Sequence, residues 1–290
     1  MLNLMACGLT LLNTVTPAGN IQAYQDLSYG SDNRQSLDIY RAKNSQKKLA
    51  VVMFIHGGYW SAGEKKQYRF VGETLAKQGY LAAIINYQLF PQVRFPVFIE
   101  DAALALAWLH EHVAEYGGDP QQLFVGGHSA GAHSAVMLAL DKHYLAAVGG
   151  DADQWIKGVF GLAGPYDFLP PTADKVAQIF GPTERYPDGN PVNFVRPHCP
   201  PMLLVHGKQD LTVGSFNSQS LADKLREAGN HVETTMVIGG HIKPLFSFSG
   251  PLREDNAILR AIDNLIHHQQ DLSLTDKTID NQALSAQTSQ

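Results

Sequence analysis

The chain has 290 residues, of which 44% are hydrophobic and 17% are charged, and its formal net charge is −5. This composition is typical of a globular protein that can bury a sizeable core, and it argues against a nucleic-acid-binding protein, which usually carries a basic surplus. No run of about 18 apolar residues predicts a transmembrane helix. Cys7 and Cys199 stand alone, and neither C-x-x-C nor H-E-x-x-H occurs, so we expect no metal site.

The first 20 residues form a separate N-terminal segment. The stretch "LMAC", Leu4 to Cys7, resembles the lipobox at the end of a bacterial lipoprotein signal. A working signal needs a basic stretch and an apolar run of about 7–15 residues, whereas the six residues before Cys7 include no basic one. Two interpretations stay open: a bacterial-type cell-envelope lipoprotein whose Cys7 belongs to a longer signal, or an accidental match in a cytoplasmic protein.

Two alternating runs come next, "IQAYQDLSY" and "QSLDIYRA", and the residues between them favour a turn, so the sequence predicts an antiparallel strand pair. The continuous apolar run at 49–55 is typical of a strand that is covered on both faces. We predict further strands at 80–87, 123–125, 156–164, 201–207 and 231–239. We predict helices at 64–78, 95–116, from Ser129 toward Leu140, 215–228 and 255–268.

Strands and helices alternate with short connections, which predicts a mostly parallel sheet flanked by helices in one α/β domain over residues 21–270. The segment at about 165–199 differs because it is rich in proline and aromatic residues, and we expect it to form a small lid. Residues 271–290 contain no aromatic residue and are expected to be a disordered tail.

The stretch "LFVGGHSAGAH" contains a candidate nucleophile. Gly127, Ser129 and Gly131 fit G-x-S-x-G, the motif in which a sharp turn exposes a serine at the top of a sheet. The motif alone is weak. Its position after an apolar strand and at the start of an alanine-rich helix favours Ser129 as the nucleophile over an ordinary strand-to-helix turn.

A serine hydroxyl needs a base, and the base needs an acid that orients it. In proteins with this motif the acid and then the histidine follow the serine along the chain. Asp210 in "LLVHGKQDLTV" and His241 in "MVIGGHIKPL" each follow a predicted strand, where ligand sites of such sheets lie. The alternative is that Asp210 caps a turn and His241 is an ordinary loop histidine.

Other side chains compete for these roles. Asp167 in "GPYDF" is a second candidate for the acid. His206 is expected to pack or hydrogen-bond locally at the end of its strand. His128 and His133 lie too close in sequence to the serine to act as its base, and His198 is expected on the lid or the surface.

The stretch "IHGGYW" at 55–60 offers unhindered backbone N–H groups after an apolar strand. The N–H groups of Gly58, Tyr59 and Ala130 could together bind the oxyanion of a tetrahedral intermediate. Glycine is favoured there because a side chain would block the approach of the backbone to a substrate. The alternative is a plain Gly-Gly turn at the end of a strand.

The motifs "HGGYW", "YGGDPQQLFVGGHSAGAH" and "LLVHGKQDLTV…GGH" resemble the α/β-hydrolase superfamily, and within it the carboxylesterase, hormone-sensitive-lipase-like and arylformamidase branch. The resemblance covers about residues 27–268 and implies Ser129 as nucleophile, His241 as base and acid, and Asp210 as orienting group. Lipase-like members often have HGGG, and this chain has Tyr59 in place of the third glycine. The form HGG-x-W occurs in arylformamidases and in some hydrolases of small esters, which leaves the substrate open.

These features predict a serine hydrolase that cleaves short-chain carboxylic esters of small-molecule substrates through an acyl-enzyme, without a cofactor. Short acyl groups are expected because only residues 165–199 can cover the site, with Trp60 and Tyr59 in its wall and His128 as a further pocket residue. The alternatives are an arylformamidase that acts on N-formylkynurenine and a non-catalytic binding protein on the same scaffold. The oligomeric state stays open, with a dimer as one option.

Overall fold

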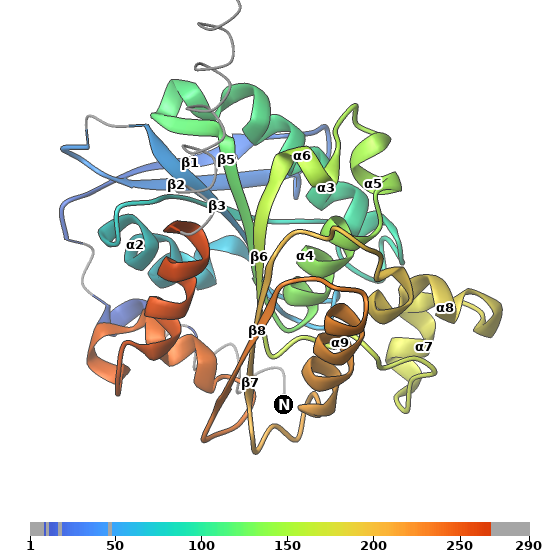
Figure 1. Ribbon diagram of the computed structural model, residues 1–290. Helices are drawn as coiled ribbons and strands as arrows, with labels where there is room; N and C mark the ends of the chain where they lie inside the picture. The colour runs from blue at the N-terminus through green and yellow to red at the C-terminus, as the bar shows by residue number, and fades with distance from the viewer. Residues whose placement is uncertain (1–8, 10–11, 17–18, 46–47, 268–290) are drawn as a thin grey trace, which may run out of the picture.

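The computed structural model describes residues 9, 12–16, 19–45 and 48–267. Cys7, on which the lipoprotein hypothesis depends, and the expected tail at 271–290 both lie outside the described residues. The described part contains one eight-stranded sheet with helices on both faces (Figure 1).

The sheet has the strand order β1-β2-β4-β3-β5-β6-β7-β8. β1 pairs antiparallel with β2, and β2 with β4, while all other neighbours are parallel, as the alternation of strands and helices predicted. The strands are β1 Ile21–Ser28, β2 Ser36–Ala42, β3 Leu49–Ile55, β4 Leu81–Ile85, β5 Gly118–His128, β6 Ile156–Leu162, β7 Met202–Gly207 and β8 Val232–Val237.

Helices connect and flank these strands. The α-helices are α2 Arg69–Lys77, α3 Val97–His112, α4 Ala130–Leu140, α5 His143–Ala146, α6 Ala152–Trp155, α7 Asp174–Phe180, α8 Tyr186–Gly189 and α9 Phe216–Glu227, and residues 257–267 are also helical. The 3-10 helices are η1 Lys65–Tyr68, η2 Val113–Tyr116, η3 Thr183–Arg185, η4 Pro191–Phe194, η5 Lys243–Phe248 and η6 Gly250–Leu252.

The boundaries differ from the sequence prediction in several places. β5 is much longer than 123–125, and the predicted helix at 95–116 is α3 followed by the 3-10 turn η2. α3 begins only at Val97 because the residue before a proline, here Phe95 before Pro96, is sterically driven away from helical geometry. The short helices α5 and α6 were not predicted, since four-residue helices carry no periodic pattern.

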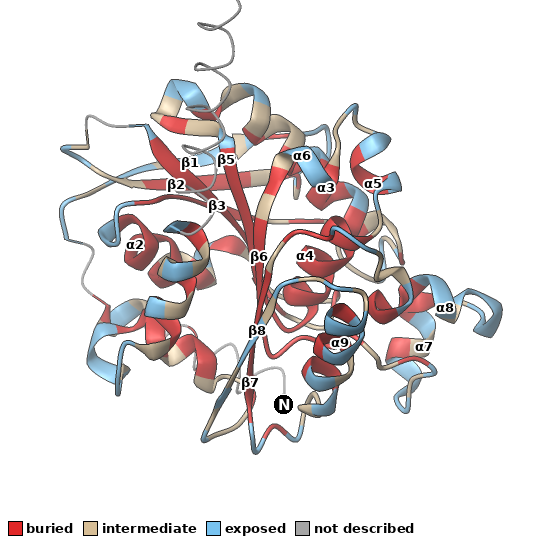
Figure 2. Cartoon of the chain, in the orientation of Figure 1, coloured by how far each residue is buried: buried red, intermediate tan, exposed pale blue. Residues whose placement is uncertain are grey.

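The core lies on both faces of the sheet, because successive side chains of a strand point to opposite faces. In β3, Val51 and Met53 belong to a core cluster under α3, α4 and α9, whereas Val52 and Phe54 belong to a second cluster under α2 and the 257–267 helix. Figure 2 shows the central strands buried along their length and the edge strand β8 partly exposed. This two-sided burial explains the continuous apolar run of β3.

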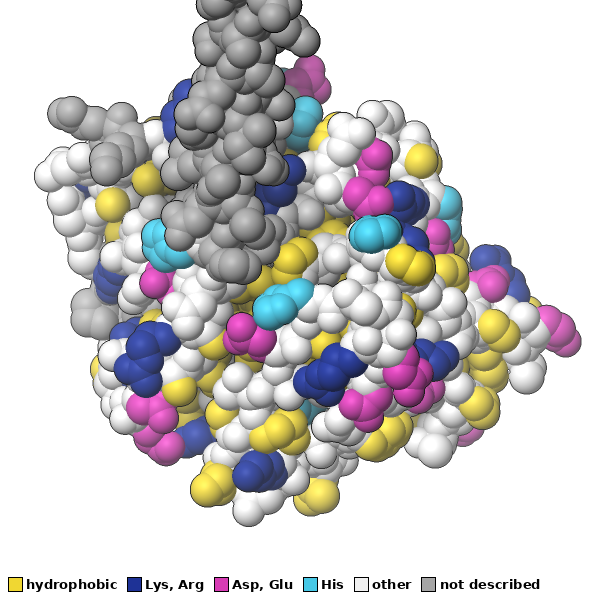
Figure 3. Space-filling view, viewed as in Figure 1, with side chains coloured by type: hydrophobic (Ala, Val, Ile, Leu, Met, Phe, Trp, Pro, Cys, Tyr) yellow, Lys and Arg dark blue, Asp and Glu magenta, His cyan; other side chains and the backbone are white. Residues whose placement is uncertain are grey.

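The surface carries mixed charge. Figure 3 shows basic and acidic side chains scattered among one another over the face in view. None of the helices within the described ranges is long and apolar enough to cross a membrane.

The carboxyl ends of the parallel strands meet at one edge of the sheet, where sites of open α/β sheets form. Gly58 follows β3 at this edge, Ser129 follows β5, Asp210 follows β7 and His241 follows β8. The topology thus brings together residues that are up to about 180 positions apart in the chain, since each strand delivers its own loop to the same place.

Candidate active site

Ser129 is the single residue between β5 and α4, and its backbone has φ 57° and ψ −121°. A positive φ is strained for a residue with a side chain, so the turn depends on its neighbours. A Cβ on Gly127 would lie 2.3 Å from the carbonyl oxygen of Gly131, and a Cβ on Gly131 would lie 2.1 Å from that of Ile55. The two glycines therefore let strand and helix approach closely enough to hold Ser129 in this conformation.

Three predicted residues form one hydrogen-bonded chain. His241 Nδ1 lies 2.7 Å from Asp210 Oδ2, and His241 Nε2 lies 2.8 Å from Ser129 Oγ. A carboxylate can only accept, so Nδ1–H donates to Asp210. Nε2 of the neutral ring is then free to accept the proton of the Ser129 hydroxyl. All three side chains are buried, which shields these bonds from water.

Asp210 is held as a carboxylate. Burial alone raises the pKa of Asp210, but hydrogen bonds from His206 and His241 outweigh it and keep the pKa well below its ordinary value. The other carboxylate oxygen, Oδ1, accepts the N–H groups of Thr212 and Val213, both at 2.9 Å. The charge and the orientation of Asp210 are therefore set by four donors on neighbouring segments.

His206 contributes to this arrangement from within β7. Its Nε2–H donates to the carbonyl oxygen of Val213 at 2.9 Å and lies 3.3 Å from Asp210 Oδ2, while Nδ1 accepts from Ser218 Oγ at 2.7 Å. The expected local hydrogen bonding of His206 is present. Its contact with the orienting acid was not predicted, because only the tertiary structure places the ring beside the carboxylate.

The predicted oxyanion loop, residues 55–60, has a strained backbone. Gly58, Tyr59 and Trp60 have φ values of 133°, 54° and 50°, three successive residues with positive φ. A Cβ on Gly58 would lie 2.1 Å from the carbonyl oxygen of Ala62. Ala130 is the first residue of α4, so its N–H has no partner within the helix.

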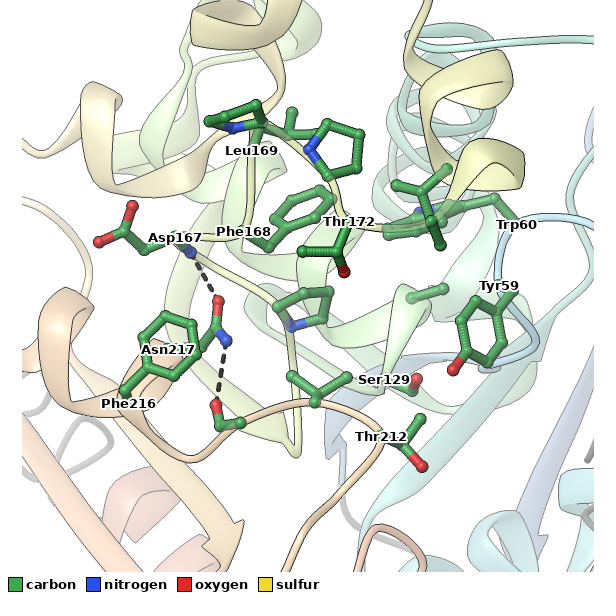
Figure 4. Close-up of a pocket in the computed structure, with 18 residues that line it drawn as sticks. Tyr59, Trp60, Ser129, Asp167, Phe168, Leu169, Thr172, Thr212, Phe216 and Asn217 are labelled. Atoms are coloured by element: carbon green, nitrogen blue, oxygen red, sulfur yellow. Dashed lines mark hydrogen bonds between the residues drawn. The ribbon is translucent and has the colours of Figure 1, made fainter.

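A cavity of about 430 Å³ opens above Ser129. Tyr59, Trp60, Ser129 and Ala130 all line it, whereas Gly58 is not among the lining residues. In the view of Figure 4, Ser129 and Tyr59 lie on one side of the cavity, and Asp167 and Phe216 lie on the other. Ser129, the predicted nucleophile, thus faces a hollow that a small molecule can occupy.

Much of the far wall comes from the segment at 165–199, which was predicted to cover the site. Pro165, residues 167–173 and Val176 line the cavity. Asn217 anchors the start of this segment, because its Oδ1 accepts the N–H groups of Tyr166 at 2.9 Å and Asp167 at 2.8 Å. Asn217 was missed in the sequence, since an asparagine at a helix start carries no sign of a distant partner.

Two of the competing residues are placed away from the nucleophile. The Asp167 carboxylate accepts the Ser220 hydroxyl at 2.6 Å and points away from Ser129 in Figure 4. His133 is fully buried, and its Nε2 donates to the Gly189 carbonyl at 2.8 Å. His198 is exposed, in agreement with the expected surface position.

His128 is not a pocket residue in the structure, which corrects the sequence prediction. Its ring is buried, its Nε2 bonds the carbonyl oxygen of His241, and its Nδ1 bonds the hydroxyl of Tyr68. Side chains alternate along β5, so a residue next to the nucleophile points beneath the site and not into the cavity. Tyr68 was missed because its hydroxyl reaches this ring from a different part of the chain.

The sequence profile of the BD-FAE family matches residues 37–225, about two thirds of the chain. The chain belongs to the BD-FAE family. The matched range contains Ser129, Asp210 and the loop at 55–60, and His241 lies beyond it.

Curated relatives of this family member are named as esterases. A probable isoprenylcysteine alpha-carbonyl methylesterase of Arabidopsis thaliana is 29% identical over 79% of this chain and 52% of its own length. Esterase LipC of Mycobacterium tuberculosis is 31% identical over 68% of this chain and 54% of its own length. The chain therefore spans about half the length of these relatives.

Solved structures of esterases share the fold of this chain. Esterase B from Lactobacillus rhamnosis superposes with a TM-score of 0.80 at 20% identity, covering 93% of this chain and 94% of that one. A truncated carbohydrate esterase from gut microbiota superposes with a TM-score of 0.75 at 22% identity, covering 88% and 99%. The predicted fold class is confirmed.

Proposed function

We propose that this BD-FAE family member is a serine carboxylesterase that hydrolyses short-chain esters through an acyl-enzyme. The observation that carries the proposal is the position of His241, whose two ring nitrogens bond Asp210 Oδ2 and Ser129 Oγ at 2.7 and 2.8 Å. The esterase names of the curated relatives support the same reaction.

The reaction begins when Ser129 Oγ attacks the ester carbonyl carbon and His241 Nε2 takes the hydroxyl proton. Asp210 stabilises the positive charge that forms on the ring. Collapse of the tetrahedral intermediate breaks the bond to the alcohol, which leaves with the proton from His241. Water then attacks the acyl-enzyme in the same way, the acid departs, and Ser129 regains its proton.

The oxyanion of each tetrahedral intermediate is assigned to the N–H groups of Gly58, Tyr59 and Ala130. Tyr59 and Ala130 line the cavity together with Ser129, which supports this assignment. The loop is held in a strained conformation before substrate arrives, so little reorganisation is needed during the reaction. Removal of one such donor typically costs about 10²–10³ in rate.

Short acyl groups are favoured by the wall at Trp60. Its ring stacks on Phe98 and Phe168, with centroid distances of 5.8 Å to each, and meets Phe180 edge-on at 4.8 Å. Aromatic rings on several sides hold Trp60 in place, so the wall does not yield to a long chain. Residues 165–199 act as the small lid that closes the cavity from above.

The test is hydrolysis of p-nitrophenyl acetate, butyrate and decanoate, with N-formylkynurenine beside them, by wild type and Ser129→Ala. We expect turnover of the two short esters and a fall in kcat by a factor of roughly 10⁶ in the alanine variant. Ser134→Ala is the matched control, because Ser134 lies on the same helix and its hydroxyl donates to the Ala130 carbonyl at 3.2 Å. It should keep the wild-type rate.

Other outcomes would decide between the alternatives. Turnover of N-formylkynurenine alone would identify an arylformamidase with the same triad. A folded wild-type protein that hydrolyses none of the four compounds would contradict the esterase assignment and favour the binding-protein alternative. Retained activity in Ser129→Ala would overturn the assignment of the nucleophile.

We further propose that Cys7 is lipidated when it belongs to a longer signal, which would attach the enzyme to the bacterial cell envelope. The support is the stretch "LMAC" in the sequence. Metabolic labelling with a palmitate analogue tests this, with Cys7→Ser as control. A wild-type protein that takes up no label would contradict lipidation.

A further inference from the structure

We infer that Tyr68 and His128 are positioning residues. They hold the oxyanion loop and the catalytic His241 in place relative to Ser129. The inference rests on the proposed function, because it assigns a task within that reaction. Neither residue lines the cavity, and both lie beneath it.

Three hydrogen bonds connect loops that follow β3, β5 and β8. The N–H of Gly57 donates to Tyr68 Oη at 3.1 Å, Tyr68 Oη lies 3.1 Å from His128 Nδ1, and His128 Nε2 lies 3.1 Å from the carbonyl oxygen of His241. Gly57 directly precedes the proposed oxyanion donor Gly58. His128 directly precedes the nucleophile, and His241 is the base.

The direction of every bond in this chain is determined. The His241 carbonyl can only accept, so His128 Nε2 carries the hydrogen and Nδ1 of the neutral ring accepts. Tyr68 therefore donates its hydroxyl hydrogen to Nδ1, and its oxygen accepts the N–H of Gly57. A neutral ring is required, and burial lowers the pKa of His128 to about 3, so the bonding pattern persists at any pH where an esterase works.

Tyr68 and His128 also pack tightly against the backbone of Gly57. A Cβ on Gly57 would lie 2.9 Å from His128 Nδ1 and 3.1 Å from Tyr68 Oη, so the backbone of the oxyanion loop rests directly on both side chains. Tyr68 and His128 are themselves nearly fully buried. Loss of the Tyr68 hydroxyl would leave a buried N–H and a buried ring nitrogen without partners.

Displacement of the oxyanion loop relative to Ser129 affects the transition state more than the bound substrate. The oxyanion exists only while the tetrahedral intermediate forms, so the N–H groups of the loop stabilise the transition state and not the bound ground-state ester. Breaking the connection should therefore lower kcat and leave KM nearly unchanged. A residue that merely stabilises the fold would not separate the two parameters.

The test is Tyr68→Phe, which removes one oxygen atom and keeps the ring. With p-nitrophenyl butyrate we expect kcat to fall by about 10-fold or more, with KM within about twofold, since the oxyanion donors are displaced and not removed. A trifluoromethyl ketone that forms a tetrahedral adduct on Ser129 should bind more weakly by the same factor as kcat/KM falls. Butyrate, the product acid, should bind as in wild type.

Tyr80→Phe is the matched control. Tyr80 is also buried and its hydroxyl bonds a carboxylate oxygen of Asp263, at the amino-terminal end of β4, away from the site. The control should lose stability without a change in kcat or in inhibitor affinity. An equal loss of kcat in both variants would mean that Tyr68 acts only through the fold and would overturn the inference.

Two changes at His128 test the other half of the connection. His128→Gln places an amide near the position of Nε2, and His128→Asn places one near Nδ1, so each keeps one of the two bonds. Both should lower kcat. Adding Tyr68→Phe to His128→Gln should cost little further rate, because the glutamine has already broken the Tyr68 bond.

Different results would contradict the positioning role of Tyr68 and His128 and the proposed esterase function. If Ser129→Ala is inactive while Tyr68→Phe and both His128 variants keep the wild-type kcat and inhibitor affinity, the positioning role is wrong and the esterase mechanism stands. If Ser129→Ala keeps its activity, the proposed function itself is wrong. Should Tyr68→Phe not fold, the His128 variants carry the test alone.

Discussion

The indole of Trp60 stands edge-on to the imidazole of His133, with ring centroids 5.1 Å apart and an interplanar angle of 86°. One ring belongs to the oxyanion loop and the other to the helix that starts at the nucleophile. The cavity wall at Trp60 therefore packs directly on the helix that follows Ser129.

Trp60→Leu should lengthen the acyl chains that the enzyme accepts. The smaller side chain removes the ring from the wall, so kcat/KM for p-nitrophenyl octanoate relative to acetate is expected to rise by about 10-fold, a gain of about 1.4 kcal/mol in transition-state binding. The lost packing should cost about 2–4 kcal/mol of unfolding free energy. An unchanged chain-length profile in a folded variant would contradict the assignment of Trp60 to the acyl wall.

Asp210→Asn should lower kcat by a factor of about 10⁴, because the amide no longer fixes the tautomer of the His241 ring. The KM for p-nitrophenyl butyrate should change little. Hydrogen bonds hold the pKa of Asp210 below its ordinary value, so protonation of this residue does not cause a loss of activity as the pH falls from 7 to 5. A variant within tenfold of the wild-type kcat would identify another acid, and Asp167→Asn would then be measured.

The stability of the fold should fall as the pH drops from about 6.5 toward 5. Burial lowers the pKa of His56 and His128 to about 3 and that of His133 to about 4. In the unfolded chain each takes up a proton near pH 6.5, so the unfolded state binds more protons below that pH. Each of the three can thus cost up to about 1.4 kcal/mol of unfolding free energy per pH unit.

Urea denaturation at pH 7.5, 6.5 and 5.5 measures this effect above the range in which most carboxylates titrate. The unfolding free energy should decrease by about 1 kcal/mol from pH 7.5 to 6.5 and more steeply below pH 6.5. His133→Gln, if it folds, should reduce the slope of the unfolding free energy against pH by the contribution of one proton. A free energy that stays constant down to pH 5.5 would show that these rings are not held neutral in the folded protein.

Gly131→Ala should destabilise the fold and reduce activity together. Its Cβ would lie 2.1 Å from the Ile55 carbonyl oxygen and 2.5 Å from that of His56, so α4 and the start of the oxyanion loop must move apart. Overpacking of this kind costs about 1–3 kcal/mol. Gly250→Ala is the matched control, because no described atom lies within 4 Å of its Cβ position and its φ lies outside the left-handed range.

Thermal unfolding and kcat for p-nitrophenyl acetate are measured on both glycine variants. Gly250→Ala should be within about 0.5 kcal/mol of wild type and fully active. Equal stability and activity in Gly131→Ala would mean that the close approach of strand and helix is not needed at the elbow.

Local patterns were sufficient for the strands and longer helices and for the residue types of the site. The alternating sequence runs at β1 and β2, the continuous apolar run of β3 and the G-x-S-x-G motif each follow from short-range rules, and β3 was confirmed at 49–55. The order of Ser129, Asp210 and His241 along strand ends also followed, because parallel strands deliver their carboxyl ends to one edge.

Only the tertiary structure decided which side chains meet beneath and beside that edge. The bonds of Tyr68 to His128, of His206 to the Asp210 carboxylate and of Asn217 to the 165–176 wall join separate segments, and sequence spacing carries no record of them. His128 shows the physical reason most plainly. Its neighbour Ser129 lines the cavity, yet the alternation of a strand and the close packing of the core turn the His128 ring inward, where it bonds the carbonyl oxygen of His241.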